Sequence, residues 1–292
     1  MNRTGGGRPN AVSQRDDDHA GSGTSTMPRS AVSSAAGRER GPLPTRVDDL
    51  PPLPPGYQAT LEAGLAALRL TLPPATRAAI DGHVRLLLAW TAAINLTAIR
   101  DPVAVAREHV LDSLSALPLL RRHGVDAVLD LGSGGGFPGL PLALALPARR
   151  ALLVESVAKK ARFLATVTTA LGIDDLVAVA PIRAEALAAD PRQRGVWPAV
   201  VARAVASLAE LAELAFPLLG PNGLLVAWKR LPLDVELARA APALAAVGGG
   251  PPRIVPSGVP GLEDHVLVVV SRVGPTPAGY PRSPAERARR PW

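Results

Sequence analysis

Glycines spaced two residues apart follow an aspartate near the middle of this sequence. In residues 129–147, LDLGSGGGFPGLPLALALP, Asp130 precedes Gly132, Gly134 and Gly136 in the pattern D-x-G-x-G-x-G. Because glycine has no side chain, a ligand can lie directly against such a backbone. The apolar run that leads into Asp130 is typical of a buried strand, and ligands of open α/β sheets bind beyond the carboxyl ends of strands. The pattern therefore predicts a nucleotide-type binding site.

Three classes of nucleotide site use a glycine loop. A phosphate-binding loop would end in Gly-Lys-Ser/Thr, which this loop lacks. A dinucleotide site has the pattern G-x-G-x-x-G, which is present at Gly134, Gly136 and Gly139, so a nicotinamide-dependent oxidoreductase remains an alternative. The carboxylate of Asp130 is unfavourable beside a pyrophosphate, and it favours a ligand that carries an ammonium group, such as S-adenosylmethionine.

A second carboxylate, Glu155, lies at the end of the next apolar run, ALLVES (151–156). At the end of a second strand, this carboxylate could accept hydrogen bonds from both hydroxyls of a ribose. Both nucleotide hypotheses use Glu155, so it does not separate them. A solvated strand end is the alternative.

Two basic residues end later apolar runs: Arg203 in AVVARA (199–204) and Lys229 in GLLVAWK (223–229). We expect Arg203 to orient substrate or cofactor, although an arginine at a strand end can also pair with a carboxylate. Lys229 could contact a nucleic-acid phosphate or be solvated. The sequence has no cysteine and its five histidines are scattered, so we find no catalytic triad, paired carboxylates or metal-ligand cluster.

Short apolar runs and amphipathic stretches alternate in the part of the chain that would position these residues. The predicted strands are 127–132, 151–156, 176–181, 199–204, 223–229, 253–256 and 264–273. The predicted helices are two within 57–93, separated at LPPAT (72–76), and then 103–121, 139–146, 158–172, 207–220 and 233–247. Strands that are apolar on both faces and separated by helices predict an α/β fold with a mostly parallel sheet covered on both sides.

Composition distinguishes the beginning of the chain from the rest. Residues 1–56 are rich in Gly, Ser, Pro, Arg and Asp and poor in large apolar residues, so we predict a disordered N-terminal extension. The formal net charge of +7 suggests a polyanionic partner, although an arginine-rich composition can also be a general feature of the proteins that a genome encodes. No apolar run reaches the roughly 18 residues of a membrane span.

Several segments together resemble the ribosomal RNA small subunit methyltransferase G family, also called the glucose-inhibited division protein B family. They are NLTAIRDPVAVAREHVLDSL (95–114), VLDLGSGGGFPGLPLAL (128–144), VESVAKKARFL (154–164), IRAEAL (182–187), VVARAVASLAELAE (200–213) and LVAWKR (225–230). The resemblance extends from about residue 57 to the end, whereas residues 1–56 have no counterpart in it.

The resemblance implies a Rossmann-like class I methyltransferase fold with a seven-stranded, mostly parallel sheet, an antiparallel last strand and preceding N-terminal helices. The methyltransferase domain would span 57–273, with a helical part at 57–122, and a basic tail would follow at 274–292. The implied reaction moves the methyl group of S-adenosylmethionine to nitrogen 7 of a guanine in 16S ribosomal RNA. We expect a cytoplasmic monomer that binds the small ribosomal subunit and no membrane.

Site residues follow from the loop chemistry and from the resemblance together. The candidate cofactor-binding residues are Asp130, Gly132, Gly134, Phe137, Glu155, Ala184, Glu185 and Arg203, of which Arg203 is also the candidate catalytic residue. The candidate RNA-binding residues are Arg100, Arg107, His109 and Lys229, to which the tail adds Arg282, Arg287, Arg289 and Arg290. Guanine nitrogen 7 has a free lone pair and no proton, so its methylation needs alignment rather than a base or a metal. An RNA-binding protein with a non-catalytic fold of this kind remains an alternative.

Overall fold

The computed structural model describes residues 42–147 and 150–292. Within them, one seven-stranded sheet has the strand order β3-β2-β1-β4-β5-β7-β6. The strands are β1 (Ala127–Leu131), β2 (Arg150–Val154), β3 (Val177–Ala180), β4 (Trp197–Arg203), β5 (Leu219–Arg230), β6 (Arg253–Pro256) and β7 (His265–Ser271).

The pairing of the strands confirms the predicted topology. Strands β3, β2, β1, β4 and β5 pair in parallel, with Leu129 opposite Leu152 on one side and opposite Val200 on the other. Only β7 runs against its neighbours, pairing antiparallel with both β5 and β6. The chain order reverses at β1, which lies between β2 and β4, so a crevice is expected at the carboxyl ends of these three strands.

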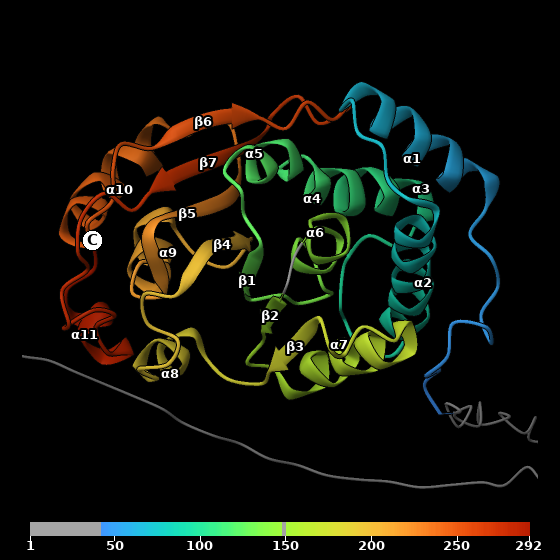
Figure 1. Ribbon diagram of the computed structural model, residues 1–292, viewed down its shortest axis with the longest axis horizontal. Coiled ribbons are helices and arrows are strands. Elements are labelled where there is room, and N and C mark those ends of the chain that lie inside the picture. Colours follow the sequence, from blue (N-terminus) through green and yellow to red (C-terminus); the bar gives the residue numbers. More distant parts are fainter. Residues whose placement is uncertain (1–41, 148–149) are drawn as a thin grey trace, which may run out of the picture. The chain divides into compact units, whose positions relative to one another are not determined.

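Helices cover both faces of this sheet (Figure 1). One face carries α1 (Pro55–Ala67), α2 (Pro74–Thr91), α3 (Pro102–Val105), the π-helix η1 (Ala106–Leu111), α4 (Asp112–Leu114), α5 (Leu117–Arg122), α6 (Gly139–Ala145) and α7 (Ala158–Leu171). The other carries α8 (Ala184–Ala189), α9 (Leu208–Ala215) and α10 (Asp234–Ala246), with α11 (Pro284–Arg289) at the end of the chain.

Alternate strand residues supply two separate hydrophobic cores. In β1, Val128 belongs to the core under α1–α7, and Leu129 belongs to the core under α8–α10. In β5, Trp228 and Ala227 divide in the same way. Successive side chains of a strand point to opposite faces, which is why the central strands are apolar without interruption.

Several predicted element boundaries are wrong, and proline explains two of them. The helix predicted over 103–121 ends at Leu114 and restarts at Leu117, where Pro118 lies in the first turn, because proline has no N–H for a continuing helix. The helix predicted over 207–220 ends at Ala215, before Pro217, and β5 begins at Leu219. The short helices α8 and α11 were not predicted.

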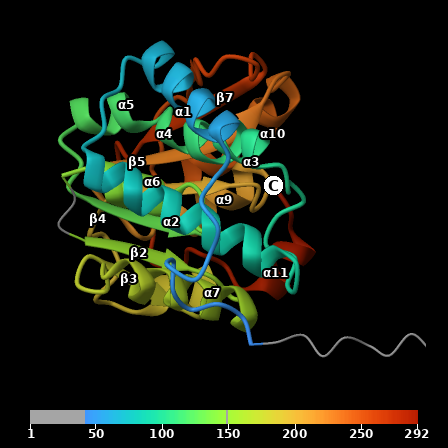
Figure 2. The same ribbon diagram turned by 90° about the vertical axis from the view of Figure 1, so that its right-hand side faces the viewer.

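Residues 1–41 of the predicted disordered extension lie outside the described residues. Residues 42–56 are described, and here the structure differs from the prediction. Leu43, Val47, Leu50 and Leu53 are partly buried against the first core. The indole Nε1 of Trp90 also donates to the carbonyl of Pro44 at 2.7 Å. These aliphatic side chains are spaced among prolines, so they form no periodic pattern. Figure 2 shows this segment running along α2 towards α7.

Candidate functional site

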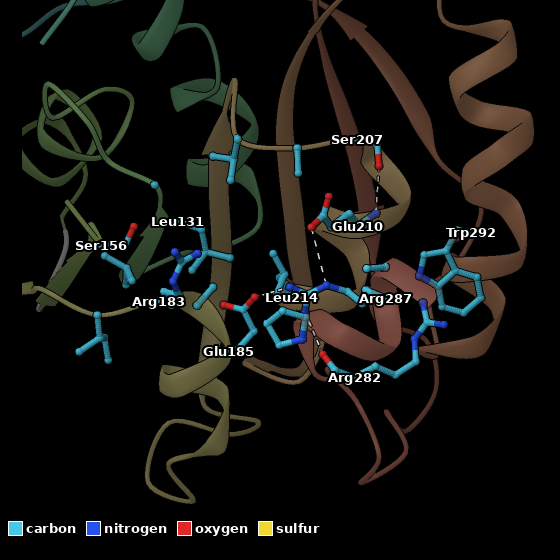
Figure 3. Close-up of a pocket in the computed structure, with 18 of the residues that line it drawn as sticks. Leu131, Ser156, Arg183, Glu185, Ser207, Glu210, Leu214, Arg282, Arg287 and Trp292 are labelled. Atoms are coloured by element: carbon cyan, nitrogen blue, oxygen red, sulfur yellow. Dashed lines mark hydrogen bonds and ion pairs between the residues drawn. The ribbon is translucent and has the colours of Figure 1, made fainter. Parts of the chain in front are cut away.

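A cavity of about 660 Å³ lies at the carboxyl ends of β1, β2 and β4, where the reversal of strand order predicts a crevice. Its walls come from Gly132 after β1, Glu155 after β2, Ala184 and Glu185 at the start of α8, and Val205 after β4. Figure 3 shows that the tail around α11 forms a further wall opposite α8. The volume is in the usual range for a small-molecule site.

The glycine loop is shaped by its own packing as well as by room for a ligand. Gly132 has a φ of +73°, and a Cβ there would lie 2.7 Å from Val205 of the turn after β4. A Cβ on Gly139 would lie 2.5 Å from the Oδ2 atom of Asp130. Of the glycines from 132 to 139, Gly132 lines the cavity, and the others allow the loop to fold back on the protein.

Asp130 lies beneath the loop and is not among the residues that line the cavity, so the predicted direct contact with a ligand is not seen. The side chain is fully buried, and its Oδ2 accepts a hydrogen bond from the backbone N–H of Gly139 at 3.0 Å. Its Oδ1 is buried and has no hydrogen-bond partner. Burial raises the pKa of Asp130 to about 7, against the lowering effect of its hydrogen bonds.

Glu155 lies on the cavity wall, as predicted, and two backbone N–H groups orient it. Oε1 accepts from Val157 at 2.8 Å, and Oε2 accepts from Gly134 in the glycine loop at 2.9 Å. Each carboxylate oxygen can accept a further hydrogen bond. The side chain can therefore take a pair of hydroxyl donors without moving.

A second cavity, of about 360 Å³, lies beside the first, beyond the end of β4. Arg203 lines it, and its Nη1 donates to the carbonyl of Glu108 at 2.9 Å and to Oδ2 of Asp112 at 3.1 Å. The Asp112 carboxylate is buried and also accepts from Nδ1 of His265 at 3.0 Å, while Trp228 Nε1 donates to the Asp112 carbonyl at 2.7 Å. Arg203 is thus held rigidly at the wall of this cavity.

The π-helix η1 makes the Glu108 carbonyl available to Arg203. In an α-helix this carbonyl would accept from the N–H of Asp112. Here the Asp112 N–H bonds to the carbonyls of Arg107 and His109 instead. Single-turn π-segments are frequent at functional sites, and this one supplies the acceptor for the arginine.

His109 is a neutral hydrogen-bonding residue in this arrangement. Burial, with the nearby Arg203 guanidinium as a second cause, lowers the pKa of His109 to about 3. Its Nδ1 lies 3.0 Å from Nη2 of Arg203, which can only donate. The imidazole proton is therefore assigned to Nε2, which donates to the Thr97 hydroxyl at 2.7 Å.

The turn that separates the two cavities contains a strained residue. Ala204 has a φ of +56°, in the left-handed region that alanine rarely adopts. It lines the smaller cavity, and the next residue, Val205, lines the larger one. Strain of this kind is concentrated at functional sites.

Other predicted site residues have different surroundings from those expected. Phe137 is not among the residues lining either cavity; its ring stacks on His83 and His109, with Arg203 Cζ at 5.5 Å from its centroid. Lys229 lines the smaller cavity, but its Nζ is engaged by Glu236 at 2.6 Å and the Ala206 carbonyl at 2.9 Å.

The arginines predicted to bind RNA fall into two groups. Arg100 is exposed, Arg107 is half-buried in η1, and Arg289 and Arg290 are exposed in the tail. In contrast, Arg282 and Arg287 are in ion pairs with buried or half-buried carboxylates. Arg282 and Arg287 therefore have structural partners. Of these arginines, Arg100, Arg107, Arg289 and Arg290 are the ones open to a polyanion.

Sequence reasoning missed His265, Trp228 and the C-terminal tail as contributors to the cavity walls. His265 and Trp228 reach Asp112 from strands β7 and β5, and no local pattern connects them. The tail wall was missed as well, although Ser283 and Glu286 have the spacing of a capping box and could have predicted α11. Across the described residues, no group of three or more His, Cys, Asp or Glu could hold a metal ion, and no helix could cross a membrane.

Comparison with known proteins identifies the family of the chain. The family model of rRNA small subunit methyltransferase G (GidB) matches residues 77–254. A ribosomal RNA small subunit methyltransferase G from Roseiflexus sp. (strain RS-1) is 44% identical over 205 residues, covering 70% of this chain and 87% of the relative. Its counterpart from Dehalococcoides mccartyi (strain CBDB1) is 38% identical over 229 residues, covering 78% and 97%.

Solved structures resemble the chain more distantly. The cofactor-bound Rv0187 from MTB has a TM-score of 0.49 and 20% identity, covering 77% of this chain and 100% of that protein. An O-methyltransferase from Bacillus cereus has a TM-score of 0.48 and 16% identity, covering 74% and 99%. The family is shown by the family model and by the identity to the two relatives, and not by the solved structures. This chain belongs to the rRNA small subunit methyltransferase G family.

Proposed function

We propose that this chain transfers the methyl group of S-adenosylmethionine to nitrogen 7 of a guanine in 16S ribosomal RNA. The observation that supports this most is the pair of adjoining cavities that meet at the turn after β4. The larger is suited to a nucleoside without phosphate, and the smaller is bounded by a rigidly held arginine and an indole. The family match supplies the class of RNA.

The residues of the larger cavity are compatible with S-adenosylmethionine, which supplies an electrophilic methyl group when bound. Glu155 is oriented to accept the ribose hydroxyls. Ala184 and Glu185, at the opposite end, would contact the adenine. Asp130 does not line the cavity, but its ionised form, present above its pKa of about 7, places negative charge beneath the loop and favours a cationic ligand over a pyrophosphate. This last point favours the methyl donor over a nicotinamide dinucleotide.

Arg203 and its partners would act by positioning. Guanine nitrogen 7 attacks with its own lone pair, so no proton has to be removed from it. His109, the histidine beside Arg203, is neutral and has both ring nitrogens engaged, which fits a reaction without a general base. Arg203, fixed by Asp112 and Glu108, would align the guanine with the methyl group.

Binding of the ribosomal substrate would be largely electrostatic. The net charge of +7 favours RNA, and the exposed Arg100 lies on the connector that leads to the smaller cavity, which Ile99 lines. We propose that the enzyme acts as a cytoplasmic monomer on the small subunit. Sedimentation of the chain with and without small subunits tests this proposal.

The proposed reaction is tested with small subunits and 16S RNA from cells that lack this protein. The purified chain and S-adenosylmethionine should add one methyl group to one guanine, located by mass mapping. Arg203→Lys should reduce kcat strongly with little change in cofactor affinity, because Arg203 lines only the smaller cavity. Calorimetric binding of NAD, without binding of S-adenosylmethionine, would favour the oxidoreductase. Cofactor binding without methyl transfer to either RNA would favour the non-catalytic alternative.

A further inference from the structure

The C-terminal segment Arg282–Trp292 is attached at both ends to one buried carboxylate, Glu213 of α9. Arg282 donates from Nε to Oε1 at 3.0 Å and from Nη2 to Oε2 at 2.7 Å. Trp292 is the eleventh and last residue of this segment, and its Nε1 donates to Oε2 of Glu213 at 2.6 Å. The Arg282 guanidinium also lies over the Trp292 ring, 4.5 Å from its centroid. The segment is therefore a closed loop rather than a free tail.

Helix α11 lies within this closed loop and forms a wall of the larger cavity. A capping box between Ser283 and Glu286 sets its start, and Pro284 occupies the first turn. Pro284, Arg287 and Trp292 are among the residues that line the cavity. Chain segments far apart in sequence thus enclose one site, as Figure 3 shows.

Arg287 is the residue of α11 that connects this wall to the opposite side. Its guanidinium pairs with Glu185 at the start of α8, and its Nε lies 3.7 Å from Oε1 of Glu210 on α9. The Arg287 side chain is 11% exposed, and its Nε has no hydrogen-bond partner. Burial is the largest single effect on the pKa of Glu185 and would raise it. The hydrogen bond and the charge of Arg287, with contributions from the backbone and from Arg183, together lower that pKa below its usual value.

We propose that Arg287 is a positioning residue of the cofactor site, which orients the Glu185 carboxylate to accept a hydrogen bond from the 6-amino group of adenine. This inference rests on the proposed function, because it takes the ligand to be S-adenosylmethionine. An ionised carboxylate has about four acceptor positions, so the ion pair leaves capacity for the amino group. The tail, rather than contacting RNA through Arg287, thereby helps to select an adenine nucleoside.

The test compares the full chain with three variants: Arg287→Gln, Arg287→Lys and Arg289→Gln. The last is a matched control, because Arg289 is on the same helix, is exposed and carries the same charge. Calorimetry measures the Kd of S-adenosylhomocysteine and of its 6-oxo analogue, S-inosylhomocysteine, which lacks the amino group. Steady-state methylation gives KM for the cofactor and kcat.

The wild type should prefer the amino compound by about tenfold or more, as expected for a hydrogen bond to a charged group. Arg287→Gln should lose most of this preference and raise the cofactor KM with little change in kcat. Arg287→Lys should restore part of the preference, and Arg289→Gln should keep the wild-type Kd for both compounds in calorimetry, where no RNA is present. Equal preference in Arg287→Gln and wild type, or equal losses in both glutamine variants, would overturn the inference.

A second variant keeps the test decisive if Arg287→Gln is unfolded. Glu185→Gln should lose the same preference, and Arg287→Lys placed in that background should change it no further, because the two residues act as one unit. Additive losses would overturn the inference. A wild type that binds neither compound and methylates no RNA would instead contradict the proposed function, so the two failures are distinguishable.

Discussion

Asp130→Asn changes the charge of the most deeply buried carboxylate at the site without changing its shape. Burial moves the pKa of Asp130 from 3.8 to about 7 in the folded protein. The folded state therefore holds this proton more tightly than the unfolded chain. Stability contributed by the protonated form is present below pH 3.8 and is lost as the pH rises to about 7. At pH 8 the buried charge costs about 4 kcal/mol.

Asparagine does not ionise, so its effect on the free energy of unfolding does not depend on pH. It would leave a buried amide N–H unpaired in place of Oδ1, at about 1–3 kcal/mol. At pH 8 the variant should therefore be more stable than wild type by about 1–3 kcal/mol, while at pH 5 the advantage should vanish or reverse. The difference should change by about 3 kcal/mol between the two pH values, or by about 6–12 °C in Tm for a domain of this size.

The assay is thermal unfolding of the ligand-free protein from pH 5 to pH 8.5, with exposed Asp49→Asn as the control for losing one negative charge. Calorimetry with S-adenosylhomocysteine should also show weaker binding by Asp130→Asn, because the negative charge beneath the loop is gone. A Tm difference that stays constant across this pH range would refute the reasoning about the buried charge. Unchanged ligand affinity would refute its role in the site.

Three further substitutions test the packing around the site. Gly139→Ala should destabilise the fold by about 1–3 kcal/mol in chemical denaturation, because its Cβ would lie 2.5 Å from Asp130 Oδ2, and a neutral result would contradict the close approach. Lys229→Gln should cost about 1 kcal/mol and leave RNA affinity in a filter-binding assay unchanged, since Nζ is bound to Glu236; reduced affinity would return Lys229 to the RNA surface. Glu213→Gln should lower Tm by an amount equivalent to about 3–5 kcal/mol, because it breaks a buried ion pair, and should weaken cofactor binding; an unaltered Tm would show that the tail is not held there.

The sequence alone determined the α/β fold, the mostly parallel sheet and the family. Uninterrupted apolar runs of strand length can be satisfied only by burial on both faces, so they predict a parallel sheet wherever they alternate with helices. The glycine loop and Glu155 follow directly from strand ends, where backbone geometry places residues at one edge of a sheet. These inferences depend on local pattern, and the structure places Gly132 and Glu155 on the wall of one cavity.

Only the tertiary structure decided which of the candidate residues line a cavity. It placed Asp130 beneath the loop, and it brought His265 and Arg203 to the same carboxylate, Asp112, from three separate parts of the chain. It also turned a basic tail into a wall of the larger cavity through Glu213. Such pairs form because a buried charge must find a partner, and which partner lies within reach depends on packing across the whole domain rather than on neighbours in sequence.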